Sequence, residues 1–170
     1  MNGGQPVRRY RAMFFEPIGT LADGPSDGGR PACLLPGARE LLDAVSGTGL
    51  HMGLIAPGGT RNLDGTLGRL GIDRQFDSRT TAEEVGAAGP DMRTFRAALK
   101  KAGCEPRQAI FVAGSIGRGI GGAKAAGMTT VLLDAGMSQG ELEQADFVAS
   151  SPARLVKILL ELAYTGVPAD

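Results

Sequence analysis

The sequence has no tryptophan, one histidine, two cysteines and no excess of either charge. Cys33 and Cys104 lack the spacing of a metal site and are too few for a disulfide scaffold. The 18 basic and 18 acidic side chains cancel, so no electrostatic footprint for nucleic acid or an anionic membrane exists. The apolar run that ends before Pro17 is too short for a signal peptide or a membrane span. These absences predict a cytoplasmic protein with reduced thiols and with neither a nucleic-acid nor a membrane partner.

Glycine is abundant instead, with 27 among 170 residues. This number indicates many tight turns, and the chain length is that of one ordinary domain. We expect a flexible N-terminal tail over residues 1–9, a single domain over 10–165 and a C-terminal tail over 166–170.

Short apolar runs alternate with longer amphipathic runs along most of the chain. This alternation predicts βαβ units and a parallel sheet. We interpret as strands residues 10–15, 51–56, 109–113, 129–133 and 146–149, with 76–77 as a short extra strand. We interpret as helices residues 37–46, 61–70, 92–102 and 152–164. Gly71 and Gly103 are placed as C-caps, and residues 22–37 read as a loop without secondary structure.

Four segments that follow the predicted strands resemble motifs of the haloacid dehalogenase-like (HAD) superfamily, whose members are mostly phosphatases. Residues 16–21 read EPIGTL where that family has Asp-x-Asp-Gly-Thr-Leu, and residues 53–59 read GLIAPGG near the family's Ser or Thr. Residues 83–99 include the Pro-Asp that follows a family lysine, and residues 110–128 end in GAKAAGM, a close family phrase. The resemblance implies an α/β fold, a Rossmann-like three-layer sandwich with a central, mostly parallel sheet. The loop over 22–37 is too short for a sizeable cap domain.

The same four segments lack the polar residues of the family pattern. The degenerate positions are Glu16, Ile18, Ala56, Gly89, Gly114 and Gly119. Covalent phosphoester hydrolysis needs a carboxylate nucleophile, an acid for the leaving group, carboxylates for Mg²⁺ and a cation. Glu16 is one methylene longer than aspartate, Ile18 transfers no proton, and glycines replace carboxylates at positions 114 and 119. We therefore expect no catalytic residues, no metal site and no cofactor, Mg²⁺ included.

This pattern predicts a catalytically inactive HAD-like protein, a pseudophosphatase that acts through protein–protein contacts or regulation. A protein partner or a homo-oligomer is the expected assembly. Two alternatives stay open: a binder of a phosphorylated small molecule or nucleotide in the vacated crevice, and a HAD-type hydrolase with altered chemistry centred on Glu16. Candidate anion-binding groups are the backbone amides and hydroxyls of Gly19, Thr20, Gly58, Gly59 and Ser115.

Two further matches compete with this interpretation. Residues 62–67 read NLDGTL, but they lie on the leucine periodicity of a helix, so Asp64 is expected on a solvated helix face. Residues 117–122 satisfy G-x-G-x-x-G, with Asp134 at the end of the next strand, which is near the spacing of a dinucleotide site. Because a glycine-rich chain matches such short patterns by chance, we favour the chance explanation.

Overall fold

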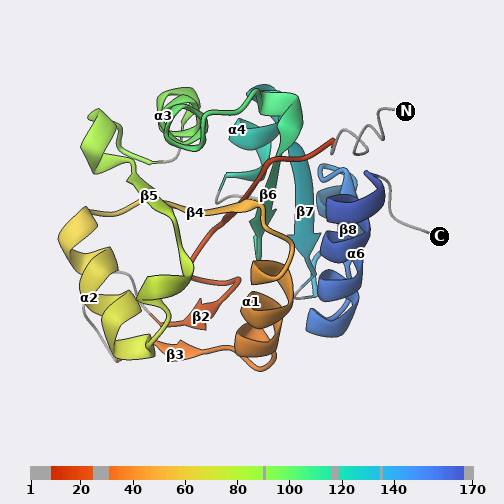
Figure 1. Cartoon of the computed structure of the whole chain (residues 1–170), viewed down its shortest axis with the longest axis horizontal. Helices are drawn as coiled ribbons and strands as arrows, with labels where there is room; N and C mark the ends of the chain where they lie inside the picture. The colour runs from red at the N-terminus through yellow and green to blue at the C-terminus, as the bar shows by residue number, and fades with distance from the viewer. Residues whose placement is uncertain (1–8, 25–30, 90, 116–118, 135, 167–170) are drawn as a thin grey trace, which may run out of the picture.

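A computed structural model describes residues 9–24, 31–89, 91–115, 119–134 and 136–166 of the chain (Figure 1). Apart from Arg9 and Gly166, the two expected tails lie outside these residues. The strands are β1 (Ala12–Phe15), β2 (Ala22–Asp23), β3 (Cys33–Leu34), β4 (His51–Ala56), β5 (Ser78–Thr81), β6 (Ala109–Ala113), β7 (Thr129–Leu133) and β8 (Phe147–Ala149). The helices are α1 (Ala38–Ser46), α2 (Thr60–Leu70), α3 (Met92–Ala102), α4 (Ile120–Ala125), α5 (Gln139–Leu142) and α6 (Pro152–Thr165), with 3-10 turns at Asp73–Gln75, Glu83–Val85 and Pro106–Gln108.

Six strands form one parallel sheet in the order β5-β4-β1-β6-β7-β8, as the alternating sequence pattern predicts. The chain builds β1, β4 and β5 outward in one direction and then crosses back to pair β6 with β1. In sheets of this kind the point where the strand order reverses opens a crevice at the carboxyl ends of the strands. Here that point lies between β1 and β6.

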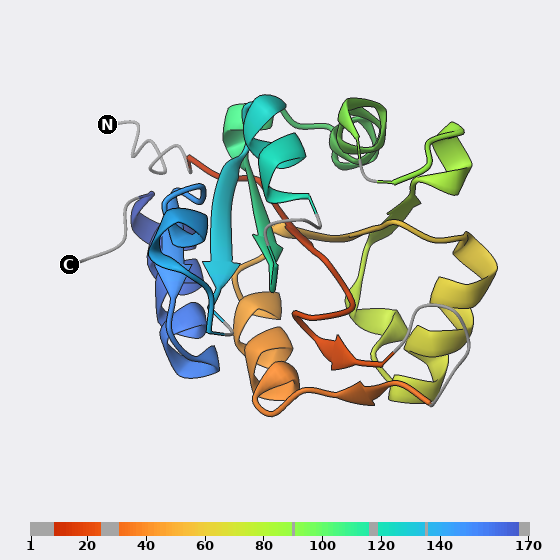
Figure 2. The same ribbon diagram turned by 180° about the vertical axis from the view of Figure 1, so that it is seen from behind.

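Helices cover both faces of the sheet and make a three-layer α/β sandwich (Figures 1 and 2). Because successive strand residues point to opposite faces, Met13 and Phe15 pack with α1, α2 and α6, while Ala12 and Phe14 pack with α3 and α4. All four are at most 1% exposed. Burial on both faces explains why β1 reads as an unbroken apolar run.

Most predicted elements agree with the structure to within two residues, and the expected C-caps are confirmed by the left-handed φ of Gly71 (67°) and Gly103 (61°). Two expectations were wrong. The expected strand over 76–77 lies two residues too early, because Phe76 fills the core and the Asp77 carboxylate accepts the Met52 N–H (2.8 Å). Residues 22–37, expected as a plain loop, contain the antiparallel β2–β3 pair.

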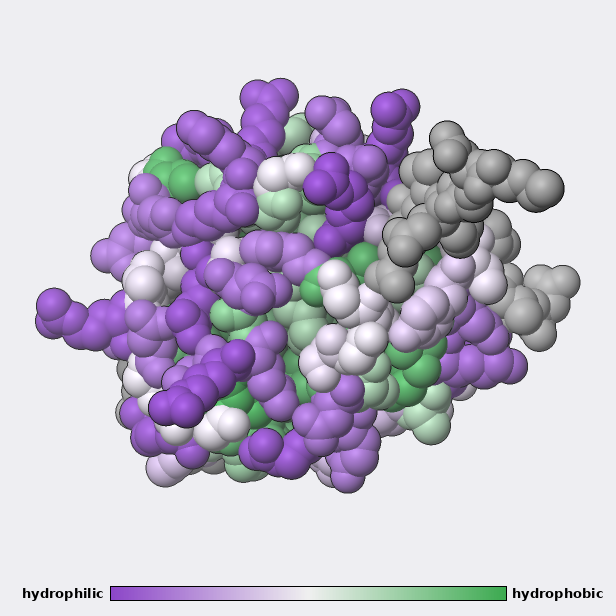
Figure 3. All heavy atoms as spheres, viewed as in Figure 1, coloured by the Kyte–Doolittle hydropathy of each residue, from purple (hydrophilic) through white to green (hydrophobic). Residues whose placement is uncertain are grey.

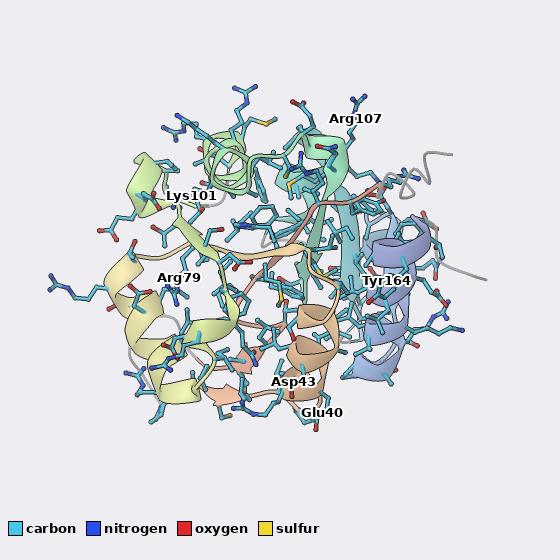
Figure 4. The ribbon with its side chains drawn as sticks, in the orientation of Figure 1. Glu40, Asp43, Arg79, Lys101, Arg107 and Tyr164 are labelled. Carbon is cyan, nitrogen blue, oxygen red and sulfur yellow. The ribbon has the colours of Figure 1, made fainter. Side chains whose placement is uncertain are left out.

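The described residues include no cap domain over the sheet edge. Hydrophilic residues occupy most of the face in Figure 3, and hydrophobic ones appear between them in small patches. Tyr164, labelled on α6 in Figure 4, is 60% exposed. In the part of the chain that the structure describes, no helix has both the length and the apolar character to cross a membrane.

Candidate active site

The carboxyl ends of β1, β4 and β6 meet at one edge of the sheet. Phe15 is in register with Leu54 of β4 and with Val112 of β6. Glu16 follows β1 directly and donates its backbone N–H to the Val112 carbonyl oxygen at 2.9 Å. Gly114 follows β6 in the same way. The strand register therefore brings Glu16 and Gly114 together at the switch point of the sheet.

Glu16 is a buried acid at this edge, with 1% of its surface exposed. Its Oε2 accepts a hydrogen bond from the Gly114 backbone N–H, with an N···O distance of 3.4 Å. The longer glutamate side chain thus extends from the end of β1 to the end of β6.

The turn after β1 packs directly on Gly114. A Cβ atom at position 114 would overlap the Gly19 carbonyl oxygen and would lie 2.5 Å from the carbonyl carbon. Gly19 has φ 90°, and the Leu21 and Ala22 N–H groups both donate to the Pro17 carbonyl oxygen, which fixes the turn. Gly114 therefore allows backbone to occupy the space that a side chain at this position would need.

Two hydroxyl groups on either side of this contact are buried without a hydrogen-bond partner among the described residues. They are Thr20 Oγ1, in a residue 2% exposed, and Ser115 Oγ. The Thr20 backbone nitrogen lies 3.2 Å from the Cβ position at Gly114. Because leaving a buried hydroxyl unsatisfied costs about 1–3 kcal/mol, both groups suit an oxygen-rich ligand. The predicted candidates Gly19, Thr20 and Ser115 are thus brought together.

Small residues connect the end of β4 to the start of α2. Ala56 is 4% exposed, and a Cβ at Gly58 would meet no atom within 4 Å. The Glu83 carboxylate lies over Gly59, the residue before α2, which has no side-chain cap. A carboxylate at a helix N-terminus is favourable. Sequence reasoning missed Glu83, which lies 24 positions along the chain from Gly59.

The remaining two degenerate positions differ from each other. Gly89 has open space around its Cβ position. Gly119 has φ 120°, precedes α4, and would place a Cβ 3.3 Å from the rings of Phe111 and Phe95. A side chain is therefore tolerated at Gly89 and strained at Gly119.

A cavity of about 260 Å³ opens beside Glu16. One wall is the turn after β1, and the other is the inner face of α2 and the segment that follows it. The side chains on which its character depends are Ile18, Leu63, Thr66, Leu67, Leu70 and Ile72. Among the described lining residues, Glu16 alone is ionisable. Asp23 lines a separate cavity of about 470 Å³ together with Thr20 and Asp134.

Two cationic side chains near β5 and α3 form ion pairs with carboxylates on the surface. Arg79, seen next to α2 in Figure 4, pairs with Asp64 at 3.3 Å, which agrees with the expected solvated helix position of Asp64. Lys101 pairs with Glu84 at 2.8 Å. Both of these cations are therefore paired with acids other than Glu16.

The competing dinucleotide match gains no support. Residues 117 and 118 lie outside the described residues. The Asp134 carboxylate accepts the backbone N–H groups of Met137 and Gly136 at 2.9 and 2.8 Å, and these bonds lower the pKa of Asp134. Asp134 thus stabilises its own loop.

The residues around Glu16 include few of the oxygen ligands that Mg²⁺ binds. Among the described residues, no three His, Cys, Asp or Glu side chains converge. Mg²⁺ nevertheless keeps several waters and often takes one or two protein carboxylates plus substrate phosphate oxygens. One carboxylate, Glu16, with the unpartnered hydroxyl of Ser115, which follows the Gly114 whose N–H Glu16 accepts, fits an ion shared with substrate phosphate.

Comparison with known proteins gives the family. Residues 31–133 match the model of haloacid dehalogenase-like hydrolases, and the chain belongs to this family. The chain is 32% identical to the glyceraldehyde 3-phosphate phosphatase of Methanothermobacter thermautotrophicus over 111 residues, 65% of this chain and 49% of that protein. It is 35% identical over 103 residues to a pyrimidine 5'-nucleotidase of Escherichia coli, covering 59% and 45% of the two chains. The chain spans about half the length of these curated relatives.

Solved structures agree on the fold. A HAD family hydrolase from Deinococcus radiodurans with bound phosphate and sodium superimposes with a TM-score of 0.79 at 17% identity, over 95% of this chain and all of that one. A HAD phosphatase from Thermococcus onnurineus gives a TM-score of 0.67 at 28% identity, over 74% and 58% of the chains.

These relatives overturn two predictions. The expectation of an inactive protein that acts through protein contacts is contradicted by relatives named as phosphatases and a nucleotidase. The alternative centred on Glu16 agrees better with them. The expectation of no cofactor is also contradicted, because phosphatases of this family typically use Mg²⁺. Both errors came from taking the lost carboxylates as decisive and the longer side chain of Glu16 as a disabling change.

Proposed function

We propose that this chain is a HAD-type hydrolase of phosphate monoesters whose chemistry is centred on Glu16. The observation that carries the proposal is the position of that carboxylate. It is buried at the switch point of the sheet, accepts the Gly114 N–H and lies in the wall of a cavity. The phosphatase and nucleotidase names of the relatives support the same reaction class.

The proposed reaction has two displacements at phosphorus. A Glu16 carboxylate oxygen attacks phosphorus, the ester P–O bond breaks, and the leaving group departs with the bonding electrons. Water then attacks phosphorus, the P–O bond to Glu16 breaks and its electrons return to the carboxylate. Inorganic phosphate is released, and a proton from the water passes to the solvent. The hydroxyls of Thr20 and Ser115, which have no hydrogen-bond partner among the described residues, orient the phosphoryl oxygens. Glu16 and Ser115 would hold Mg²⁺, which supplies charge neutralisation when bound.

The test is phosphate release from a panel of phosphate monoesters with Mg²⁺, for the wild type and Glu16→Gln. The glutamine is nearly isosteric and is not a nucleophile. Loss of a nucleophile alone can cost on the order of 10⁶ in rate, so we expect turnover to fall to background. Equal thermal unfolding of the two proteins is the folding control. Unchanged turnover in Glu16→Gln would refute the role of Glu16.

Glu16→Asp tests the length of the side chain. The shorter carboxylate withdraws from the end of β6, and a misplacement of about 1 Å can cost ~100-fold. We expect kcat to fall about 100-fold while unfolding changes little. An aspartate variant as fast as the wild type would show that the reach toward Gly114 plays no part in catalysis.

A further inference from the structure

The cavity beside Glu16 carries information about the substrate. We infer that the substrate is a phosphate ester with a small apolar leaving group that departs as an anion, without a proton from the protein; an aryl phosphate has this chemistry. The inference rests on the proposed hydrolysis at Glu16 and names the class of ester on which it acts.

The first observation is the apolar wall. Leu63 and Leu67 point from α2 into the core with 8% and 0% exposure, and Ile72 is 1% exposed. These three, with Leu70 and Ile18, line the cavity that Glu16 also lines. Asn62 and Thr66 are the polar side chains among the described lining residues other than Glu16. A charged or sugar-like leaving group would lose more water there than these two side chains can replace, which is costly. At about 260 Å³, the cavity lies below the usual range for drug-sized ligands, so the group is small.

The second observation is the residue that stands two positions after Glu16. Ile18 lies in the cavity wall and is held by a bridge to Ala22. Its side chain has no proton to give. The nearest acid along the chain after it, Asp23, lines the other cavity, on the far side of the turn. Among the described residues that line this cavity, none apart from Glu16 is ionisable, so the leaving oxygen finds an apolar side chain at Ile18 and no second acid.

These two observations together select the leaving group. A general acid contributes about 10²–10⁴ in rate, and this contribution is largest for alcohols that leave poorly as anions. A leaving group whose conjugate acid is a phenol needs less help, and its ring is the kind of group that an apolar wall accepts. An alkyl phosphate has a leaving group that departs poorly as an anion, and a sugar phosphate has in addition a leaving group too polar for this wall.

The experiment is a series of substituted phenyl phosphates and a simple alkyl phosphate, assayed on the full chain with Mg²⁺. We expect kcat/KM to fall steeply as the leaving-group pKa rises. At a matched pKa, we expect a gain of roughly fourfold for each added methylene that the cavity buries. Comparable rates for alkyl and aryl phosphates would overturn the inference and leave the proposed function intact. No hydrolysis of any ester would refute the proposed function itself.

Variants of Ile18 and Leu70 test the missing acid and the apolar wall separately. Ile18→Asp adds an acid and should raise the alkyl phosphate rate by about 10²–10⁴ while changing the most activated aryl ester little. Ile18→Asn has nearly the same shape as Ile18→Asp but no acidic proton, so it should not raise the alkyl phosphate rate. Equal gains in both variants would show that a missing proton donor is not the limit. Leu70→Gln should reduce the advantage of the bulkier aryl esters, whereas Arg74→Gln, an exposed residue that does not line the cavity, should not.

Discussion

Gly114 and Gly89 both stand where the family pattern has a charged side chain, but the structure treats them differently. At Gly114 the turn after β1 fills the space of a side chain, because the Gly19 carbonyl group occupies the position of a Cβ atom. At Gly89 no atom lies within 4 Å of the Cβ position. The absence of a carboxylate at Gly114 is therefore part of the packing of the site. At Gly89 the missing ammonium group has no counterpart in the packing, because the space for a side chain is open.

The largest expected effect is that of Gly114→Ala. A single methyl group overlaps backbone atoms that hydrogen bonds hold in place, and overpacking against rigid neighbours exceeds the usual 1–3 kcal/mol. We expect the free energy of unfolding to drop by about 3 kcal/mol or more, measured by chemical denaturation. A loss below about 0.5 kcal/mol would show that the turn moves away easily, and the contrast with Gly89 would disappear.

Thr20→Val tests the buried hydroxyl beside this contact. Replacing an unsatisfied polar group by an apolar one of the same shape is nearly neutral or stabilising. We expect unfolding without ligand to change by no more than about 1 kcal/mol. Inorganic phosphate with Mg²⁺ should stabilise the wild type, by about 2.7 kcal/mol at 100 times Kd, and the variant much less. An equal phosphate effect in both proteins would remove Thr20 from the site.

The smallest effect is expected for Gly89→Ala, the matched control for Gly114→Ala. Its Cβ enters open space, and its φ is not in the left-handed region. Such a change stabilises a protein by about 0.4–1 kcal/mol through the unfolded state. Denaturation under the same conditions as for Gly114→Ala checks it. Strong destabilisation would mean that the segment before α3 is packed more tightly than its surroundings indicate.

The fold could be predicted from the sequence because its main elements have local signals. The apolar runs of β1, β4 and β6, the amphipathic periodicity of α1, α3 and α6, and the caps Gly71 and Gly103 all read correctly. The short β2–β3 pair and α5 have too few residues to show a period. The position of β5 was misread because Phe76 is a core residue before the strand begins.

The site could be predicted only in part. The sequence names Glu16, Thr20, Gly114 and Ser115, and the strand register brings them to one edge of the sheet. The packing of Gly19 on Gly114 and the approach of Glu83 to Gly59 join residues that are far apart in the chain. The apolar character of the cavity was equally hidden, because the leucines of α2 signal a core helix whether or not a cavity opens beside them.

The most direct measurement is the detection of phosphate bound covalently to Glu16. The full chain is mixed with an activated aryl phosphate and Mg²⁺, quenched in acid within the first turnover and digested for mass spectrometry. Nucleophilic attack by Glu16 predicts one added phosphoryl group on the peptide that contains it, and none in Glu16→Gln. Turnover with no phosphorylated peptide, or the same modification in Glu16→Gln, would contradict the central role of this carboxylate.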